Sequence, residues 1–586
     1  MPAPSTTALD ENTFFMIMFT FGSLMGLVTL VYVIKQAFSR QSGEVGGWEL
    51  RGARQRIAAV VRTTLAEGLR ARVASGFALL ILISIPIFWL TAEGDGTIKG
   101  KVQMFITYSL GLTSFLLAVL TILFSCRSLS VEIASRQIYG IATKPIPRWQ
   151  IIVGKWLGVM TLNVALLAIA CLMTWAGTRA NVSRFKKDLE YDLITYGSLT
   201  PSQAADTIAA LANVRGVGKE GMESPIIAAF ASQLGKTHEE IGDMLLRLPE
   251  STRVNLRRFD ELRRQVLVAR TIIPAPLPDF SKDIDEVYQA LREQGRLPED
   301  WSDRRIREQI YKELVGGYCA IGPGEVRVWR MQGPPPQEGR DWVMSLRFKI
   351  RAMRQPLATQ MGGITLETDS LLGRWILGDP RTSAYIETID QYPINTITEI
   401  EIPQQGVEKD GAVIVNFQNI DPRQIDAIFD LPTGDLQVLY RVGSWELAML
   451  QAALAMLIPL SCLAAFGVCA STFLSFPVGT LIVLTLYIIS SSMGFVADSL
   501  AVSREYAPPE HDRTLVYEVR RLTVESIGFA LSIGDLDPVN KLMEGLAIGW
   551  KPLADTAWKY LLAKGVVVLT LGVFILRRRE LAAVIV

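Results

Sequence analysis

The chain has 586 residues, of which 49% are hydrophobic and 20% charged, and its formal net charge at pH 7 is +1. This length exceeds what a single ordinary hydrophobic core supports, so two or more folded units are expected. The near-zero charge argues against a nucleic-acid-binding protein, because it leaves no basic excess to neutralise phosphates. Long uncharged runs alternate with polar stretches, which indicates that some segments lie in a bilayer and others in water.

The first uncharged run extends from residue 12 to residue 34, which is long enough to cross the hydrocarbon core as a helix. A cleaved signal peptide is the alternative. Such a peptide begins with basic residues, whereas Asp10 and Glu11 precede this run. Residues 1–35 are therefore predicted to hold an uncleaved transmembrane helix.

Later apolar runs predict six further spans, so the expected fold is a polytopic α-helical membrane protein with about seven transmembrane helices. The three runs 74–92, 102–126 and 156–178 make residues 74–178 one membrane region, 447–497 holds two spans, and 557–586 holds the last one near 557–576. Within the 447–497 stretch, Ser471, Thr472 and Pro477 are expected to form the turn between the two helices.

The distribution of basic residues predicts the orientation of these spans, because cytoplasmic loops are enriched in Lys and Arg. Residues 35–73, the loop 127–155 and the triple arginine 577–579 are basic and are therefore assigned to the cytoplasm. The N-terminus and residues 179–443 and 498–556 then lie outside. This arrangement predicts a multi-pass protein of the bacterial inner (cytoplasmic) membrane.

The outer loop 498–556 contains two apolar pieces, 527–533 and 542–550, that are too short to span a bilayer. They are predicted to be re-entrant or interfacial helices. Lys559 and Lys564 fall in the outer half of the last span and are expected to reach outward to the headgroups. A lysine that faces the transport path and meets an anionic substrate is the alternative.

The cytoplasmic segment 48–73 is predicted to be an amphipathic helix at the membrane surface. Its apolar residues recur at helical spacing, and arginines that include Arg54, Arg56 and Arg62 are interleaved with them. We expect the apolar face to enter the headgroup layer and the arginines to approach lipid phosphates. A cytosolic connector with a solvated basic face is compatible with the same pattern.

A large soluble insert is predicted between the fourth and fifth spans. Residues 179–324 are expected to be mainly helical, whereas residues 325–443 show alternating apolar and polar positions, as in Trp342–Arg351. The insert is thus predicted to be an extracytoplasmic α+β domain whose second half is an antiparallel β-sandwich. It contains no recognisable catalytic motif, so no enzymatic activity and no catalytic residue is expected in it.

The loop 127–155 carries the most informative local pattern. Glu132 to Tyr139 is predicted to form a short helix that ends at Gly140. Pro145 and Pro147 should then hold the chain extended before it re-enters the membrane, since proline lacks an amide hydrogen and restricts its predecessor. Such a loop would present a rigid projection to a cytosolic partner.

This segment resembles the intracellular loop of ABC type-2 transporter permeases. The residues that match in order and approximate spacing are Glu132, Arg136, Lys144, Pro145, Arg148, Gly154 and Lys155. The helix at 48–73 and the C-terminal segment 576–581 are also similar to that family. Family members commonly have six spans and a short outer loop, so the first span and the insert of about 265 residues are additions.

The resemblance implies that the chain is the permease subunit of a bacterial ABC exporter. Residues 128–148, with Tyr139 among them, would dock on a cytosolic ABC ATPase subunit, and a second identical or paralogous permease would complete the path. No GxxxxGK[ST] motif occurs, so ATP and Mg belong to the partner and no cofactor or metal is expected in this chain.

Two other functions are compatible with the sequence. The large insert fits a mechanical transmitter or scaffold subunit that acts on an extracytoplasmic protein partner without transporting a substrate. A membrane-bound enzyme is the third possibility, and it is disfavoured because no catalytic constellation is present.

Overall fold

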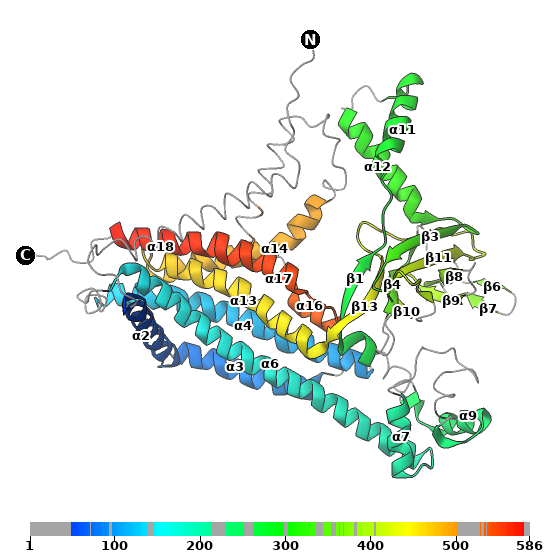
Figure 1. Ribbon diagram of the computed structural model, residues 1–586, viewed down its shortest axis with the longest axis horizontal. Coiled ribbons are helices and arrows are strands. Elements are labelled where there is room, and N and C mark those ends of the chain that lie inside the picture. Colours follow the sequence, from blue (N-terminus) through cyan, green and yellow to red (C-terminus); the bar gives the residue numbers. More distant parts are fainter. Residues whose placement is uncertain are drawn as a thin grey trace, which may run out of the picture.

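The computed structural model describes residues 48–70, 72–92, 97–136, 146–211, 230, 233–250, 252–253, 262–297, 303–335, 344–352, 359–361, 364–366, 368–379, 384–402, 406–501, 528, 532–534 and 536–578. These residues form an elongated helix bundle with a strand-rich domain at one end (Figure 1). Helix α2 (Trp48–Arg70) crosses the bundle at the opposite end. We call these two ends of the bundle the sheet end and the α2 end.

Four helices among the described residues are long and apolar enough to cross a membrane. They are α4 (Ile98–Ala134), α6 (Arg148–Thr195), α13 (Trp445–Ala470) and a continuous helix, Trp550–Arg578, composed of α17 (Trp550–Ala557), the π-helix η5 (Trp558–Gly565) and α18 (Val566–Arg578). Shorter apolar helical stretches lie in α3 (Arg72–Thr91) and α14 (Phe476–Ala501). The chain is therefore a multi-pass membrane protein.

The predicted spans coincide with these helices, except that the first, residues 12–34, lies outside the described residues. The turn predicted at Ser471 and Thr472 is confirmed, because α13 ends at Ala470 and α14 begins at Phe476, but Pro477 lies in the first turn of α14 and not between the helices. The helices are longer than the predicted spans, as two of them illustrate. The α6 helix continues to Thr195, and the last helix begins at Trp550. Charged residues end an apolar span but do not end a helix, which explains both extensions.

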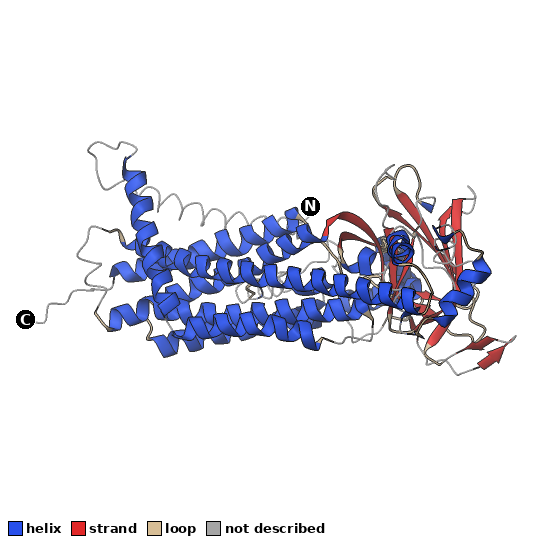
Figure 2. Cartoon of the chain, turned by 90° about the horizontal axis from the view of Figure 1, so that it is seen from below, coloured by secondary structure: helices blue, strands red, loops and turns tan. Residues whose placement is uncertain are grey.

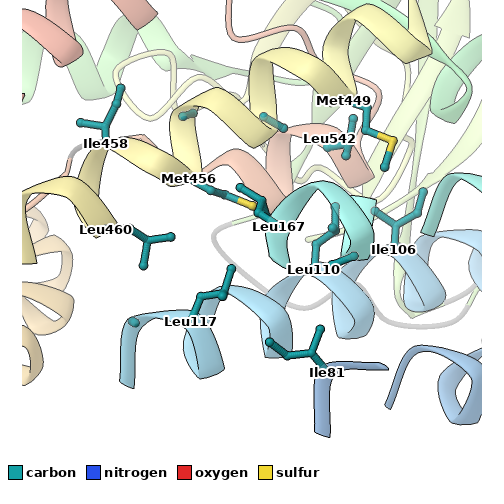
Figure 3. Packing of buried hydrophobic residues seen from close by; sticks show 14 of the residues in the cluster. Ile81, Ile106, Leu110, Leu117, Leu167, Met449, Met456, Ile458, Leu460 and Leu542 are labelled. Atoms are coloured by element: carbon teal, nitrogen blue, oxygen red, sulfur yellow. The ribbon is translucent and has the colours of Figure 1, made fainter. Parts of the chain in front are cut away.

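The core of the bundle is one apolar cluster to which all of the apolar helices contribute. Ile81 of α3, Leu110 of α4, Leu167 of α6, Met456 of α13 and Leu542 of α16 (Pro538–Met543) point toward one another (Figure 3). In the most apolar stretch of α13, 72% of the residues are buried, against 39% in α6 and in the last helix. The α13 helix is thus the central helix of the bundle.

The strands gather at one end of the molecule (Figure 2). One sheet has the order β1 (Val268–Pro274), β13 (Leu436–Ser444), β4 (Met344–Lys349) and β10 (Ile397–Glu401), and the other has the order β3 (Val326–Gln332), β11 (Ala412–Asn419), β8 (Ser370–Asp379) and β9 (Ala384–Pro393). Shorter strands are β2 (Ala320–Ile321), β12 (Ala427–Ile428), β5 (Arg351–Ala352), β6 (Thr359–Met361) and β7 (Ile364–Leu366).

Neighbouring strands within each sheet are antiparallel, which confirms this part of the prediction for residues 325–443. Both four-stranded sheets contribute to one buried aromatic cluster. The ring centroid of Trp375 from β8 lies 4.6 Å from that of Phe348 in β4 and 4.7 Å from that of Phe417 in β11. We call residues 268–444, which these sheets hold together, the sheet domain.

The region 179–324 is mainly helical among its described residues, but it also contains a strand that the prediction missed. Its helices are α7 (Pro201–Leu211), α9 (His238–Arg247), the π-helix η1 (Leu262–Val266), α11 (Ser281–Glu293) and α12 (Asp303–Cys319). Strand β1 falls between η1 and α11 and pairs with β13 more than 160 positions away. That pairing supplies hydrogen bonds that no local pattern in residues 268–274 could reveal.

A buried ion pair fixes the end of the sheet formed by β3, β11, β8 and β9. Asp421 accepts hydrogen bonds from the Arg423 guanidinium (2.7 Å) and from the amide of Leu372 at the start of β8 (2.9 Å). Burial opposes the charged form of the Asp421 carboxyl, but hydrogen bonds from the Arg423 side chain and from the Leu372 and Arg423 amides outweigh it. They hold the pKa of Asp421 below its usual value.

This arrangement predicts a pH-dependent stability. The pKa of Asp421 is lower in the folded state than the ordinary value of about 3.9. The ionised carboxyl therefore contributes fully to the free energy of unfolding well above a pH of about 3.9, and this contribution is lost as the pH falls through the folded-state pKa. Asp421→Asn should therefore lower the free energy of unfolding by about 3 kcal/mol at pH 7 and by less at pH 3. Denaturation followed by tryptophan fluorescence checks this, with the exposed-pair variant Glu408→Gln as a control that changes little. An equal loss at both pH values would contradict it.

Candidate functional site

The α2 end of the bundle is built on a close crossing of α2 over α6. Gly154 and Gly158 lie one turn apart on α6 and face α2. A Cβ atom added at Gly154 would lie 2.7 Å from Val60, and one added at Gly158 would lie 2.7 Å from Thr64. Small residues four apart allow two helix backbones to approach closely, so α2 rests in a groove that only glycine leaves open.

This crossing corrects the expected orientation of α2. The stripe that contains Val60, Thr64 and Gly68 is buried against α6 and α4, whereas Arg54 and Arg62 are exposed. Among the described residues of α2, the most buried apolar positions thus face protein. The reason is that the glycine groove of α6 offers close packing that acyl chains do not match.

A buried lysine joins α2, α4 and α6. Lys155 of α6, whose side chain is only 1% exposed, forms ion pairs with Glu132 of α4 and with Glu67 of α2, the latter at 3.2 Å. An ammonium group removed from water is costly unless carboxylates neutralise it, so the position of Lys155 requires both neighbouring helices to stay in place. We call Lys155, Glu132 and Glu67 the junction triad.

Further polar contacts surround the junction triad. Arg56 of α2 donates a hydrogen bond of 3.0 Å from Nε to the Gln150 side chain on the first turn of α6. Arg148, the first residue of α6, donates from Nη1 to the carbonyl oxygens of Leu576 (2.6 Å) and Arg577 (2.8 Å). These carbonyls belong to the last turn of α18, where helix carbonyls lack intrahelical partners. Arg148 therefore ties the start of α6 to the end of the last span.

The structure places three of the predicted coupling residues in this network and a fourth beside it. Glu132, Arg148 and Lys155 are buried or half-buried and bonded to other helices. Arg136 is exposed, follows the end of α4 and has a positive φ of 60°. Tyr139, Lys144 and Pro145 lie outside the described residues. Lys155 and Glu132 are thus structural anchors, whereas Arg136 is available to a partner.

One prediction about this loop is wrong. Glu132 does not begin a separate short helix, because α4 runs without interruption from the bundle core through Glu132 to Ala134. The hydroxyls of Ser128 and Ser130 donate to helix carbonyls within α4, at 2.9 Å and 2.6 Å, and no proline or glycine interrupts the helix there. Glu132 therefore lies on the same helix as the membrane span of α4.

Sequence reasoning missed Glu67 as a partner of Lys155. Glu67 is an acidic residue on a basic helix and lies 88 positions from Lys155, so local spacing does not connect the two. The available signal was Lys155 itself, which lies between two glycines four apart at the start of a span. A lysine in that setting faces a closely packed helix and needs a carboxylate from it.

A second polar site lies midway along the bundle. Lys564 of η5 is only 8% exposed and donates from Nζ to the carbonyl of Ser532, so the expectation that Lys564 reaches out to the headgroups is wrong. The amide of Ile533 donates to Ser490 of α14 at 2.7 Å, and the hydroxyls of Ser532 and Tyr560 are 2.8 Å apart. The non-helical backbone at 532–534 thus has side-chain partners, as buried irregular backbone requires.

Residues 12–232 match the family described as ABC-2 family transporter protein. The matched range contains the whole junction triad, helices α2, α3, α4, α6 and α7, and the predicted first span. It confirms the resemblance to ABC type-2 permeases read from the segment Glu132 to Lys155. No curated protein and no solved structure matches the chain.

The glycine groove generates the first prediction at this site. Gly158→Ala should destabilise the protein by about 1–3 kcal/mol, because the added methyl group overlaps Thr64 and pushes α2 away. Gly111→Ala in α4 is the matched control, since a Cβ there meets nothing within 4 Å and alanine favours a helix. Thermal unfolding and the rate of tryptic cleavage in α2 measure both effects. The same unfolding temperature and cleavage rate in both variants would contradict the close packing of α2 against Gly158.

The buried ion pair of the junction triad predicts an energetic coupling between Lys155 and Glu132. Lys155→Met should cost about 3–5 kcal/mol, because Glu132 is left buried without its counter-charge. Adding Glu132→Gln should restore part of that loss, since the unpaired charge is then removed. Arg179→Met is the control, because the Arg179–Glu446 pair is exposed and contributes little. Unfolding midpoints of the single and double variants give the coupling energy between Lys155 and Glu132. A loss in the double variant equal to the sum of the two single losses would contradict this coupling.

Proposed function

We propose, from the membership of residues 12–232 in the ABC-2 transporter family, that this chain is the permease subunit of a bacterial ABC exporter in the inner membrane. ATP binding and hydrolysis would take place on a separate cytosolic ABC ATPase, which also holds ATP and Mg. A membrane permease role follows from the family and from the apolar helices.

The observation that carries the ATPase coupling is the junction triad. Lys155 joins α2, α4 and α6 so that the end of α4 cannot shift without moving the other two helices. The exposed Arg136 directly follows α4 at this point. A force applied there by a cytosolic subunit would therefore reach three helices at once. The triad gives the chain a rigid end on which an ATPase can act.

The distribution of arginines supports the proposed topology. The α2 end carries the exposed Arg54, Arg62 and Arg70 and the C-terminal arginines, so it faces the cytoplasm under the positive-inside rule. The sheet domain, at the opposite end of the bundle, would then be extracytoplasmic. Addition of the 12–34 span gives seven spans with the N-terminus outside. The exposed arginines of α2 would contact lipid phosphates, and a second permease would complete the path.

Arg136 provides a direct test, because it is exposed and its replacement should leave the fold intact. Arg136→Glu should reduce co-purification of the ATPase and permease-dependent ATP turnover at least about tenfold, since one reversed charge at a docking site costs more than about 1.4 kcal/mol. Arg247→Glu on α9, exposed at the sheet end, is the matched control and should change neither. Absence of any co-purifying ATPase from the unmodified chain would reject the proposal.

A further inference from the structure

The last membrane span makes a specific contact at each of its ends. At the α2 end, Arg148 binds the carbonyls of Leu576 and Arg577. At the sheet end, residues 544–547 lead into the span and contact strand β1. Between these contacts the chain is helical from Trp550 to Arg578. At the rise of an α-helix, this helix is about 40 Å long. One continuous element thus connects the two ends of the molecule.

The contact at the sheet end is centred on Arg270 of β1, which is only 1% exposed. Its guanidinium donates to Glu399 at 2.9 Å and to the carbonyl oxygens of Gln265 and Glu544, each at 2.9 Å. A buried guanidinium with this many partners has one geometry, because each lost hydrogen bond leaves a buried donor unsatisfied. Arg270 therefore joins the sheet domain to the segment that precedes the last span.

Backbone hydrogen bonds reinforce this joint. The amide of Arg270 donates to Gly545 (2.8 Å), and the amide of Ala547 donates to Arg270 (2.7 Å), so the segment adds to the edge of β1 as a parallel neighbour. Gly545 has a φ of +68°, and a Cβ there would lie 2.1 Å from the Gln265 carbonyl oxygen. Only glycine permits this approach. Arg347 of β4 also pairs with Glu544 at 2.7 Å.

A second span enters the same sheet directly. Strand β13 ends at Ser444, and that residue is the N-cap of α13, with its hydroxyl accepting from the Leu447 amide at 3.4 Å. Strand β1 pairs with β13 along its whole length. The sheet domain is thus attached to both α13 and the last span. The part of α6 beyond Thr178, which we call the α6 extension, instead meets α13 through the exposed pair Arg179–Glu446 and packs Val182 and Phe185 against the bundle core.

We infer that the last span transmits rearrangements of the junction triad region to the sheet domain through the Arg270 joint. In this inference, a shift of Arg148 and the end of α18 carries the segment 544–547 with it, and the sheet domain turns relative to the α6 extension. This goes beyond the proposed transport role, because it assigns a mechanical task to the insert. The test of this inference needs no ATPase. The inference can therefore fail while the proposed function stands, and the proposed function can fail while the inference stands.

The test measures distances between spin labels in the full chain in lipid vesicles. The five native cysteines are buried or half-buried, so cysteines introduced at exposed positions are labelled first. Labels at Ile389 on β9 and Lys551 on α17 report the joint. Labels at Ile389 and Lys187 on the α6 extension report the position of the sheet domain.

Arg148→Ala should shift the Ile389–Lys187 distance by about 2 Å or more and leave the Ile389–Lys551 distance unchanged. Arg270→Lys, which keeps the charge but loses the planar set of donors, should broaden the Ile389–Lys551 distribution and abolish the shift caused by Arg148→Ala. Gly545→Ala should reproduce this second effect by a different route. Arg330→Lys, at an exposed pair in the same domain, is the matched control and should change neither distance.

Two results would overturn the inference. The first is an Ile389–Lys187 distance that does not respond to Arg148→Ala, since the α2 end would then have no influence on the sheet domain. The second is a shift of equal size in the presence and absence of Arg270→Lys, since the influence would then travel by another route. Circular dichroism of each variant confirms that it folds, and Gly545→Ala decides the question if Arg270→Lys does not fold.

Discussion

A lysine ammonium removed from water at the crossing of three helices must be neutralised where it lies. Lys155 meets this requirement with Glu132 from α4 and Glu67 from α2. The arrangement is possible only because Gly154 and Gly158, on either side of Lys155, let α2 approach α6 closely. Close packing and charge pairing thus depend on each other. Together they make the α2 end a single body, and the proposed coupling to an ATPase relies on that property.

The sheet end follows the same physical rule with a different ion. Arg270 is buried where strand β1, the segment before the last span and Glu399 meet, and its planar guanidinium serves all of them at once. At each end, one buried cation thus holds together elements from distant parts of the chain. The bundle between the two ends is mainly apolar and centred on α13. Its apolar contacts lack direction, so the orientation of the bundle ends depends on the polar joints.

The polar groups within the bundle have a more local role. Lys564 and Ser490 supply hydrogen bonds to the backbone of residues 532–534. A non-helical segment among membrane helices needs such partners, because no water replaces them. The buried Lys564 ammonium group donates to the Ser532 carbonyl and lies 5.7 Å from the centre of the Tyr560 ring, so it has partners in the bundle.

The sequence alone determined the membrane class, the positions of the described spans and the turn near Ser471. These features depend on bilayer thickness and on where charges stop, and both can be read along the chain. It also indicated that residues 325–443 are rich in strands, since a period of two is local, although it did not identify every strand or its neighbours. Only the tertiary structure decided the partners of Lys155 and Arg270, the strand β1 within a helical region, and the continuity of α4 through Glu132. Each of these depends on residues distant in sequence, because a buried charge or an edge strand is satisfied by whatever element packs beside it.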